Sequence, residues 1–258
     1  MVYERDDFVT IDPTIFIMGP PEHCSSFKKC ESRRKIQITN QYHLCREPVS
    51  VKRYLEFINE THYDIDYNLE YFNGKEWVLG DRFIDINSEF DNPVVGVSYF
   101  DALEFISWAS RKDSLPYRLP TEAEFELASR QNCDCKEECA KSTILKSSML
   151  IRNEEAPYKS GPYSIYDSLE NNGVFGMNGL VWQWCSDWFF YYSEEDVINP
   201  TGPKVKPNFA PWKGEQWKPG RVIRGGSFNY SHSHSSCYNR HFSKEEDRNI
   251  NLGFRLCF

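Results

Sequence analysis

Hydrophobic and polar positions alternate along several short segments of the chain, and long polar stretches separate these segments. Alternation of this kind is typical of strands that bury one face. The segments with this pattern are 8–11, 15–19 and 35–39. Two apolar runs, 93–97 and 252–258, predict buried strands. We expect Leu252, Phe254 and Leu256 to be core residues of the last strand.

Three segments carry both a capping residue and the apolar spacing of a helix. Ser50 precedes the first segment. Ser98 and Asp101 form a capping-box pair at the start of the second, and Thr121 and Glu124 do the same at the third. Apolar side chains three and four positions apart follow each start. We therefore expect three helices, each with one face in the core.

The bulk composition bounds the fold and excludes some functions. Of the 258 residues, 40% are hydrophobic, which is enough for a proper core in one or two domains. An aromatic content of 16% suits a loop-rich fold that buries large side chains. The net charge of -8 argues against nucleic-acid binding, which requires a basic face.

The chain shows no membrane-spanning or secretory pattern. It contains no apolar run of about 18 residues, so we expect no membrane span. Its first residues lack the apolar core of a signal peptide and a lipid-attachment cysteine. The expectation is a cytoplasmic protein, or a mature form with an added Met.

The chain has nine cysteines, an odd number, and their spacing shows no disulfide framework. They are Cys24, Cys30, Cys45, Cys133, Cys135, Cys139, Cys185, Cys237 and Cys257. The group at 133–139 lacks a second pair or a nearby histidine, so we interpret it as a solvated insertion rather than a zinc site. Buried thiols behave as small hydrophobes, and Cys45, Cys185 and Cys257 need no other role.

The end of the chain, from Arg224 onward, has a composition that folding alone does not explain. Gly225 and Gly226 predict a turn, and residues 229–243 contain only Asn, Tyr, Ser, His, Cys, Arg and Phe. Positions 219–243 also avoid Lys, Glu, Gln, Met and Trp. An asparagine codon cannot reach these types when its adenines are replaced. Adenine-directed diversification and a polar surface loop rich in His and Ser both fit this pattern.

A series of motifs occurs along the chain in the order of one known family. They are FIMG at 16–19, EPVSVKRYLEFI at 47–58, NPVVGVSYFDALEFISW at 92–108, RLPTEAEFELASR at 118–130, GLVWQW at 179–184, NPTGP at 199–203, RVIRGGSF at 221–228 and GFR at 253–255. On these motifs the chain resembles the formylglycine-generating-enzyme (sulfatase-modifying-factor-like) type of C-type lectin fold, from about Phe8 to the terminus. The resemblance implies a single α+β domain over 1–258, loop-rich with short helices and antiparallel strands, in which the chain termini pair.

The enzymes of this family carry two copper-binding cysteines after the RGGS motif, and the matching positions here are Tyr230 and Ser235. Cys237 is out of register and alone. A Cu(I) site of the family's kind needs two soft thiolates, so the resemblance implies no copper site here. Leu180 and Gln183 stand where the family has Asn and Glu at its calcium site, and both changes weaken an oxygen-ligand set. We therefore expect no catalysis, no bound metal and no cofactor.

A non-catalytic branch of the same fold, the variable proteins of diversity-generating retroelements, ends in RGGSW, then asparagine-derived positions, then GFR. The treponemal variable proteins give the nearest match. The resemblance assigns a variable ligand-binding region to 229–251, with Arg240, Arg248 and the GFR segment as fixed scaffold. Residues 244–246 cannot all derive from asparagine codons by adenine replacement, so we expect a fixed break there. The candidate ligand-binding residues are Asn229, Tyr230, Ser231, His232, Ser233, His234, Ser236, Cys237, Tyr238, Asn239, His241, Phe242, Ser243, Asn249, Ile250 and Asn251.

These candidate side chains are expected to be mostly exposed, because buried variation would unfold many variants. Their replacement should then leave stability nearly unchanged, and Tyr230 and Phe242 should anchor the ligand. We interpret the pair His232 and His234, and Cys237, as outcomes of codon variation rather than as a metal site or a nucleophile.

We interpret the chain as a non-catalytic ligand-binding display protein that a retroelement diversifies. Tyr, Ser and Asn suit such a surface because they combine rigid contact area with adaptable hydrogen bonding. The alternatives are a metal-dependent oxidase of the formylglycine-generating kind and an accessory domain with a fixed partner. We expect a monomer that binds an unknown protein or other surface ligand. By resemblance, its full-length form is lipid-anchored at the cell surface, and a cytoplasmic protein is the alternative.

Overall fold

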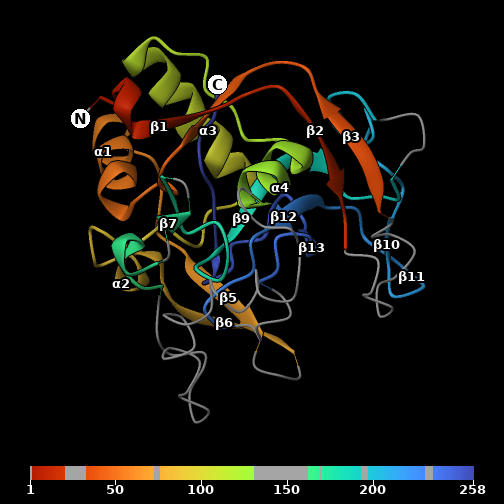
Figure 1. Cartoon of the computed structure of the whole chain (residues 1–258). Helices are drawn as coiled ribbons and strands as arrows, with labels where there is room; N and C mark the ends of the chain where they lie inside the picture. Colours follow the sequence, from red (N-terminus) through yellow and green to blue (C-terminus); the bar gives the residue numbers. More distant parts are fainter. Residues whose placement is uncertain are drawn as a thin grey trace.

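The computed structural model describes residues 2–20, 33–72, 76–130, 162–168, 170–171, 173–192, 197–229 and 235–258. Short helices and strands joined by long irregular segments make up this part of the chain (Figure 1). The fold is therefore α+β and loop-rich, as the resemblance implied. Within the described residues, no helix combines the length and the apolar composition needed to cross a membrane.

Each predicted helix is present and begins at its predicted cap. The helices are α1 (Val51–Thr61), α2 (Phe83–Ile86), α3 (Tyr99–Asp113) and α4 (Glu122–Arg130), and single 3-10 turns lie at Arg5–Asp7 and Ile165–Asp167. The Ser50 hydroxyl accepts a hydrogen bond of 3.3 Å from a backbone N–H in the first turn of α1. The backbone N–H of Ser98 donates to the Asp101 carboxylate at 2.8 Å, and that of Asp101 donates to the Ser98 hydroxyl at 3.1 Å. Thr121 and Glu124 make the same reciprocal pair at the start of α4.

A four-stranded sheet near the C-terminus is the largest sheet among the described residues, and two-stranded ribbons surround it. The strands are β1 (Phe8–Ile11), β2 (Thr14–Met18), β3 (Arg34–Ile38), β4 (Tyr42–Cys45), β5 (Asn68–Phe72), β6 (Trp77–Arg82), β7 (Glu170–Asn171), β8 (Val174–Phe175), β9 (Trp182–Trp188), β10 (Ala210–Trp212), β11 (Glu215–Trp217), β12 (Arg221–Arg224), β13 (Arg240–Ser243) and β14 (Leu252–Gly253). The sheet has the order β13-β12-β9-β14, and only the pair of β14 with β9 is parallel. Trp182, Trp184 and Trp188 of the inner strand β9 are all buried. Packing therefore explains the aromatic composition of that strand.

The predicted strand at 93–97 is not present, although all its residues are buried. Its backbone groups bond to several elements instead of one. The Val94 N–H donates to the Val49 carbonyl at 2.9 Å, and the Val95 N–H donates to the side chain of Asn87 at 3.0 Å. Because each buried backbone group finds a separate partner, the apolar run folds as an irregular segment rather than as a strand.

The two ends of the chain lie on either side of β4 rather than pairing with each other. β1 pairs with β4 in antiparallel register, with Phe8 opposite Cys45. On the other side of β4, the Cys45 N–H donates to the Leu256 carbonyl and the His43 N–H donates to the Phe258 carbonyl, both at 2.9 Å. The rings of Phe8 and Phe258 then meet edge to face at 5.0 Å.

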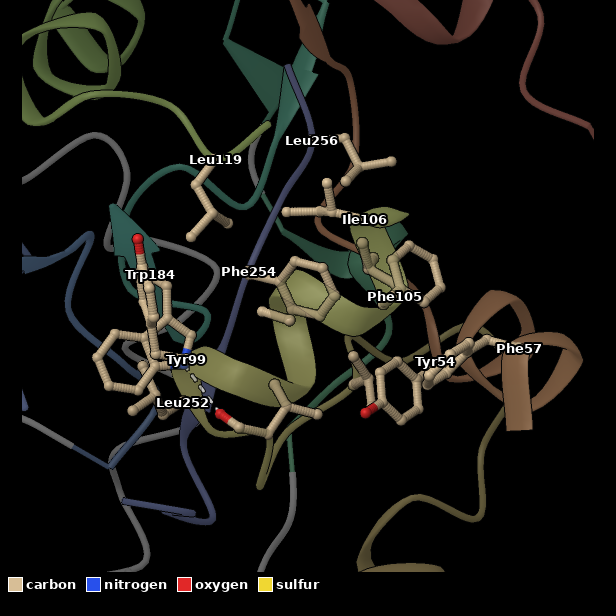
Figure 2. Packing of buried hydrophobic residues seen from close by; sticks show 14 of the residues in the cluster. Tyr54, Phe57, Tyr99, Phe105, Ile106, Leu119, Trp184, Leu252, Phe254 and Leu256 are labelled. Carbon is tan, nitrogen blue, oxygen red and sulfur yellow. Dashed lines mark hydrogen bonds between the residues drawn. The ribbon is translucent and has the colours of Figure 1, made fainter. Parts of the chain in front are cut away.

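The main core lies between α1, α3 and the end of the chain, as Figure 2 shows. Leu252, Phe254 and Leu256 are fully buried, which confirms their predicted place in the core. The Phe254 ring packs edge to face on Phe105 at 5.3 Å, and Phe105 stacks on Tyr54 at 5.6 Å. The closing segment thus joins the two long helices through aromatic contacts.

Replacing Tyr54 with phenylalanine is expected to raise the free energy of unfolding by about 1 kcal/mol, because the buried Tyr54 hydroxyl has no hydrogen-bond partner among the described residues. Urea unfolding of the two proteins measures the difference. Tyr63→Phe is the matched control, since the Tyr63 hydroxyl donates to the Asp101 carboxylate at 2.8 Å and its loss should be destabilising. A Tyr54→Phe protein that is as destabilised as the control would show that the hydroxyl is bonded.

Candidate functional site

A buried frame of ion pairs joins β12 and β13, the strands that flank residues 225–239, to α4. Arg240, at the start of β13, donates to both oxygens of Glu122 at 2.7 Å. Arg224, at the end of β12, forms a direct ion pair with Glu126. All four side chains are buried. The RLPTEAEFE and RGGS motifs therefore belong together physically, because each supplies one half of these pairs.

The charges in this frame are stabilised by their partners. Burial lowers the pKa of Arg240, but the adjacent Glu122 carboxylate more than compensates, so the pKa lies above its ordinary value. Arg224 shows the same net rise in pKa, with Glu126 as the main opposing charge. Both guanidinium groups therefore remain charged, and the frame holds as long as the carboxylates stay ionised.

Arg255 in the GFR motif is buried without a carboxylate contact. Its guanidinium donates to the Gln183 side-chain oxygen at 2.7 Å and to the carbonyls of Cys45 and Phe175 at 2.9 and 2.6 Å. Burial lowers the pKa of Arg255 to about 10. The amide nitrogen of Gln183 donates to the Gly176 carbonyl at 2.8 Å, so both ends of this amide are bonded within the protein. The Gln183 side chain therefore holds the Arg255 guanidinium in place.

The turn after β12 requires glycine. Gly225 has a φ of 99°, and a Cβ at this position would lie 2.8 Å from the Met177 carbonyl oxygen. Beyond the turn, the Asn251 amide donates to the Ser227 hydroxyl at 3.1 Å and to the Asn229 side-chain oxygen at 2.8 Å. This network connects the first and last positions of the predicted variable region.

His241 and Phe242 of β13 lie half-buried against aromatic rings. The His241 ring is 4.6 Å from that of Trp212 and 5.9 Å from that of Trp182. The Phe242 ring is 4.9 Å from that of Phe189. Sequence reasoning missed Trp212, which lies on β10 of a hairpin. The WKGEQW sequence at 212–217 turns through two positive-φ residues and is the signal that would have identified this hairpin.

The structure places the predicted ligand-binding residues in three groups. Tyr230, Ser231, His232, Ser233 and His234 lie outside the described residues. Asn229, Tyr238, His241 and Phe242 are partly exposed. The buried group consists of Ser236, Cys237, Asn239, Ser243, Asn249, Ile250 and Asn251.

The prediction that the variable-region side chains are mostly exposed is therefore wrong for the buried group. Some of these polar residues find partners where the segment returns to the sheet, whereas Ser236 Oγ and Asn249 Oδ1 have no hydrogen-bond partner among the described residues. The Ser243 hydroxyl donates to the Asp247 carboxylate at 2.7 Å, and the Asn249 amide lies 3.4 Å from the Ser243 hydroxyl oxygen. Replacing such residues would cost stability, so near-neutral replacement is no longer expected for Asn239.

The positions expected to be fixed make strong contacts. Arg248 donates to both oxygens of Asp101 at 2.7 and 2.8 Å, so Asp101 serves as helix cap and as counterion. Burial raises the pKa of Asp101, but the bond from Arg248 and the capping N–H outweigh it and lower the pKa overall. Glu245 pairs with Arg221 at 2.9 Å. Arg248 and Glu245 therefore have structural roles in the fold.

Four described cysteines, Cys45, Cys185, Cys237 and Cys257, have buried side chains. Burial raises the pKa of Cys45 to about 12 and the pKa of Cys185 and Cys257 well above the ordinary value. Ser235, at one matching copper position, is buried. Among the described residues, no three or more His, Cys, Asp or Glu side chains gather in a way that could hold a metal ion, and Cys133, Cys135 and Cys139 lie outside them.

Comparison with known proteins identifies relatives by sequence. A model of the sulfatase-modifying factor enzyme 1-like domain matches residues 2–258. The formylglycine-generating enzyme of Streptomyces coelicolor is 29% identical over 188 residues, which is 66% of this chain and 54% of that protein. The serine/threonine-protein kinase pkn1 of Chlamydia caviae is 31% identical over 176 residues, which is 64% of this chain and 24% of that protein. The chain thus matches about half of the first relative's length and about a quarter of the second's.

Two solved structures share the architecture over nearly the whole chain. PvdO from Pseudomonas aeruginosa superposes with a TM-score of 0.69 at 19% identity, covering 97% of this chain and 93% of its own. Treponema denticola variable protein 1 superposes with a TM-score of 0.67 at 18% identity, covering 97% and 94%. At these identities the likeness establishes the fold alone.

Proposed function

Because the chain belongs to the sulfatase-modifying factor enzyme 1-like domain family, we propose that it is a non-catalytic, ligand-binding member whose segment 229–251 carries the binding surface. The observation that carries this proposal is the residue pair Tyr230 and Ser235, which occupies the positions of the copper-binding cysteines. Neither side chain offers the thiolate that a Cu(I) oxidase of this kind needs.

The binding surface we propose is narrower than the segment. The surface consists of positions 230–234 together with four partly exposed residues, Asn229, Tyr238, His241 and Phe242. The buried residues Asn249, Ile250 and Asn251 then act as scaffold and do not contact the ligand. The fixed ring of Trp212 packs behind His241 and adds rigid aromatic area to the same surface.

We further propose that a retroelement diversifies the partly exposed positions, and that a longer, lipid-anchored form displays the domain at the cell surface. The codon pattern of 219–243 and the presence of a variable protein among the structural neighbours support this proposal. In sibling strains, we expect substitutions to concentrate at 229–234, 238, 241 and 242 and to spare the buried positions. An unchanged segment, or changes spread evenly over the chain, would contradict diversification.

The purified chain is expected not to oxidise a cysteine-containing sulfatase-type peptide to the aldehyde, even when Cu(I) is supplied, because Tyr230 and Ser235 replace the thiols. Mass spectrometry of the peptide measures the product. A formylglycine-generating enzyme assayed in parallel shows that the conditions permit turnover. Aldehyde formation above the buffer control would support the oxidase alternative and overturn the non-catalytic proposal.

A further inference from the structure

A separate cavity of about 430 Å³ lies beside α4, at the end of β9 and beneath the NPTGP turn. Side chains of β2, β3 and β13 complete its wall. This volume lies within the range of small-molecule sites. Neither the binding surface proposed for segment 229–251 nor the copper-site comparison uses this cavity.

One buried carboxyl group in the cavity wall has a free hydrogen-bonding position. Asp187 is only 3% exposed. Its Oδ2 accepts hydrogen bonds from the Glu122 backbone N–H at 2.8 Å and from the Ser186 hydroxyl at 3.2 Å. No described residue donates to its Oδ1. Gly202 lies beside this atom, since a Cβ built on Gly202 would be 3.4 Å from Oδ1.

The other buried carboxylate in the wall is fully occupied. Glu122 accepts from Arg240 at both oxygens, and its Oε1 also accepts from the Tyr192 hydroxyl at 3.2 Å. Asp187 is therefore the acceptor that remains for a ligand.

The carboxylates nearest to Asp187 favour a cationic partner for this side chain. Burial and the neighbouring Glu122 and Glu124 carboxylates together raise the pKa of Asp187 to about 7, although the hydrogen bonds from the Glu122 N–H and the Ser186 hydroxyl lower it. A positive group beside Oδ1 would offset both effects. The charged groups on the surrounding elements are Glu122 and Glu124 on α4, Arg240 on β13, Arg34 on β3 and Lys204 after the turn. Arg240 is already neutralised by Glu122, so its charge opposes such a ligand only weakly.

The walls suit an organic cation better than a metal ion. Trp188, Phe190, Tyr191 and Tyr192 supply aromatic surface, which attracts ammonium groups and covers apolar ligand atoms. The Tyr192 ring already lies between the guanidinium groups of Arg34 and Arg240, at 4.0 and 4.2 Å. Phe190 and Tyr191 therefore remain as the ligand-facing rings. As noted above, the described residues provide no cluster of metal-ligating side chains.

We propose that this cavity binds a small organic amine, with its ammonium group on Asp187 Oδ1 and its apolar part against Phe190 and Tyr191. The cavity would give the protein a second ligand site, independent of the surface proposed for segment 229–251.

The test is a calorimetric titration of the whole chain with 2-phenylethylamine and with its neutral counterpart 2-phenylethanol. The amine is expected to bind saturably and at least about tenfold more tightly than the alcohol. Its affinity should rise between about pH 5 and about pH 8, because Asp187 ionises in this interval while the amine stays protonated. Alcohol binding should not change with pH.

Two variants and a control complete the experiment. Asp187→Asn keeps the shape of the side chain and an oxygen for the Glu122 N–H, and it should reduce amine affinity by about tenfold or more and remove the pH dependence. Tyr191→Ala changes a partly exposed wall residue, so it should fold normally and also weaken the amine. Asp66→Asn removes an exposed carboxylate elsewhere and should have no effect.

Several outcomes would overturn the proposal. They are equal affinity for amine and alcohol, amine binding that survives in Asp187→Asn, and no saturable binding at millimolar amine. Thermal melts establish that each variant is folded, and the Tyr191→Ala result stands even if Asp187→Asn unfolds. Failure here would leave the surface proposed for segment 229–251 untouched.

Discussion

Replacing Glu126 with glutamine should lower the free energy of unfolding by about 3 to 5 kcal/mol, because it removes the carboxylate that pairs directly with the buried Arg224 guanidinium and leaves only Glu122, at 3.8 Å. Both side chains are fully buried, so water cannot replace the lost charge. Glu126 also accepts hydrogen bonds from the Gly19 N–H and from Arg130, both at 2.7 Å. The same substitution therefore loosens the contact between α4 and the end of β2.

The control for this prediction is Glu60→Gln, which also removes one negative charge from an ion pair. The Glu60 side chain is half exposed where it pairs with Lys112, so its loss should destabilise the protein much less than the loss of Glu126. Denaturant midpoints of the parent and both variants measure the effect. Equal midpoints for the two variants would show that the frame around Arg224 does not depend on the ion pair.

Replacing Phe254 with alanine should lower the free energy of unfolding by about 3 to 5 kcal/mol, since it removes a fully buried ring and leaves a cavity. This ring contacts Phe105 of α3 at 5.3 Å and Tyr54 of α1 at 6.4 Å (Figure 2). The substitution thus acts where both long helices meet the closing segment.

Phe100→Ala provides the matched comparison for this ring. Phe100 is on α3 but 51% exposed, so its loss should change stability by about 0.5 kcal/mol or less. Urea unfolding with an unchanged slope would report stability alone. If Phe254→Ala unfolded at the parent's midpoint, the closing segment would not be a core element.

Local elements could be predicted where the signal itself is local. The caps at Ser50, Ser98 and Thr121 mark the starts of α1, α3 and α4, because the bonds that define them join residues three apart. The core positions of 252–256 follow from apolar composition. The run at 93–97 was misassigned because composition reports burial but not which backbone group each N–H and C=O will meet.

The predicted binding region was harder to place than the fold. Its side chains were expected to be exposed, because variation at buried positions would unfold many variants. In the structure, the Asn251 side-chain amide donates hydrogen bonds to Ser227 and Asn229, and the backbone carbonyl of Asn239 accepts one from Arg224. These partners are distant in the sequence, so the periodicity of hydrophobic and polar positions does not predict them.

The sequence by itself determined the family motifs, the helix starts and the apolar closing segment. Tertiary structure alone decided which polar side chains are buried and which distant groups they meet. The physical reason is that a polar group can leave water only where distant segments supply its hydrogen bonds or its counter-charge. Glu122 and Arg240 are far apart in the chain, and Asp187 lies in a cavity wall that elements distant in sequence build together.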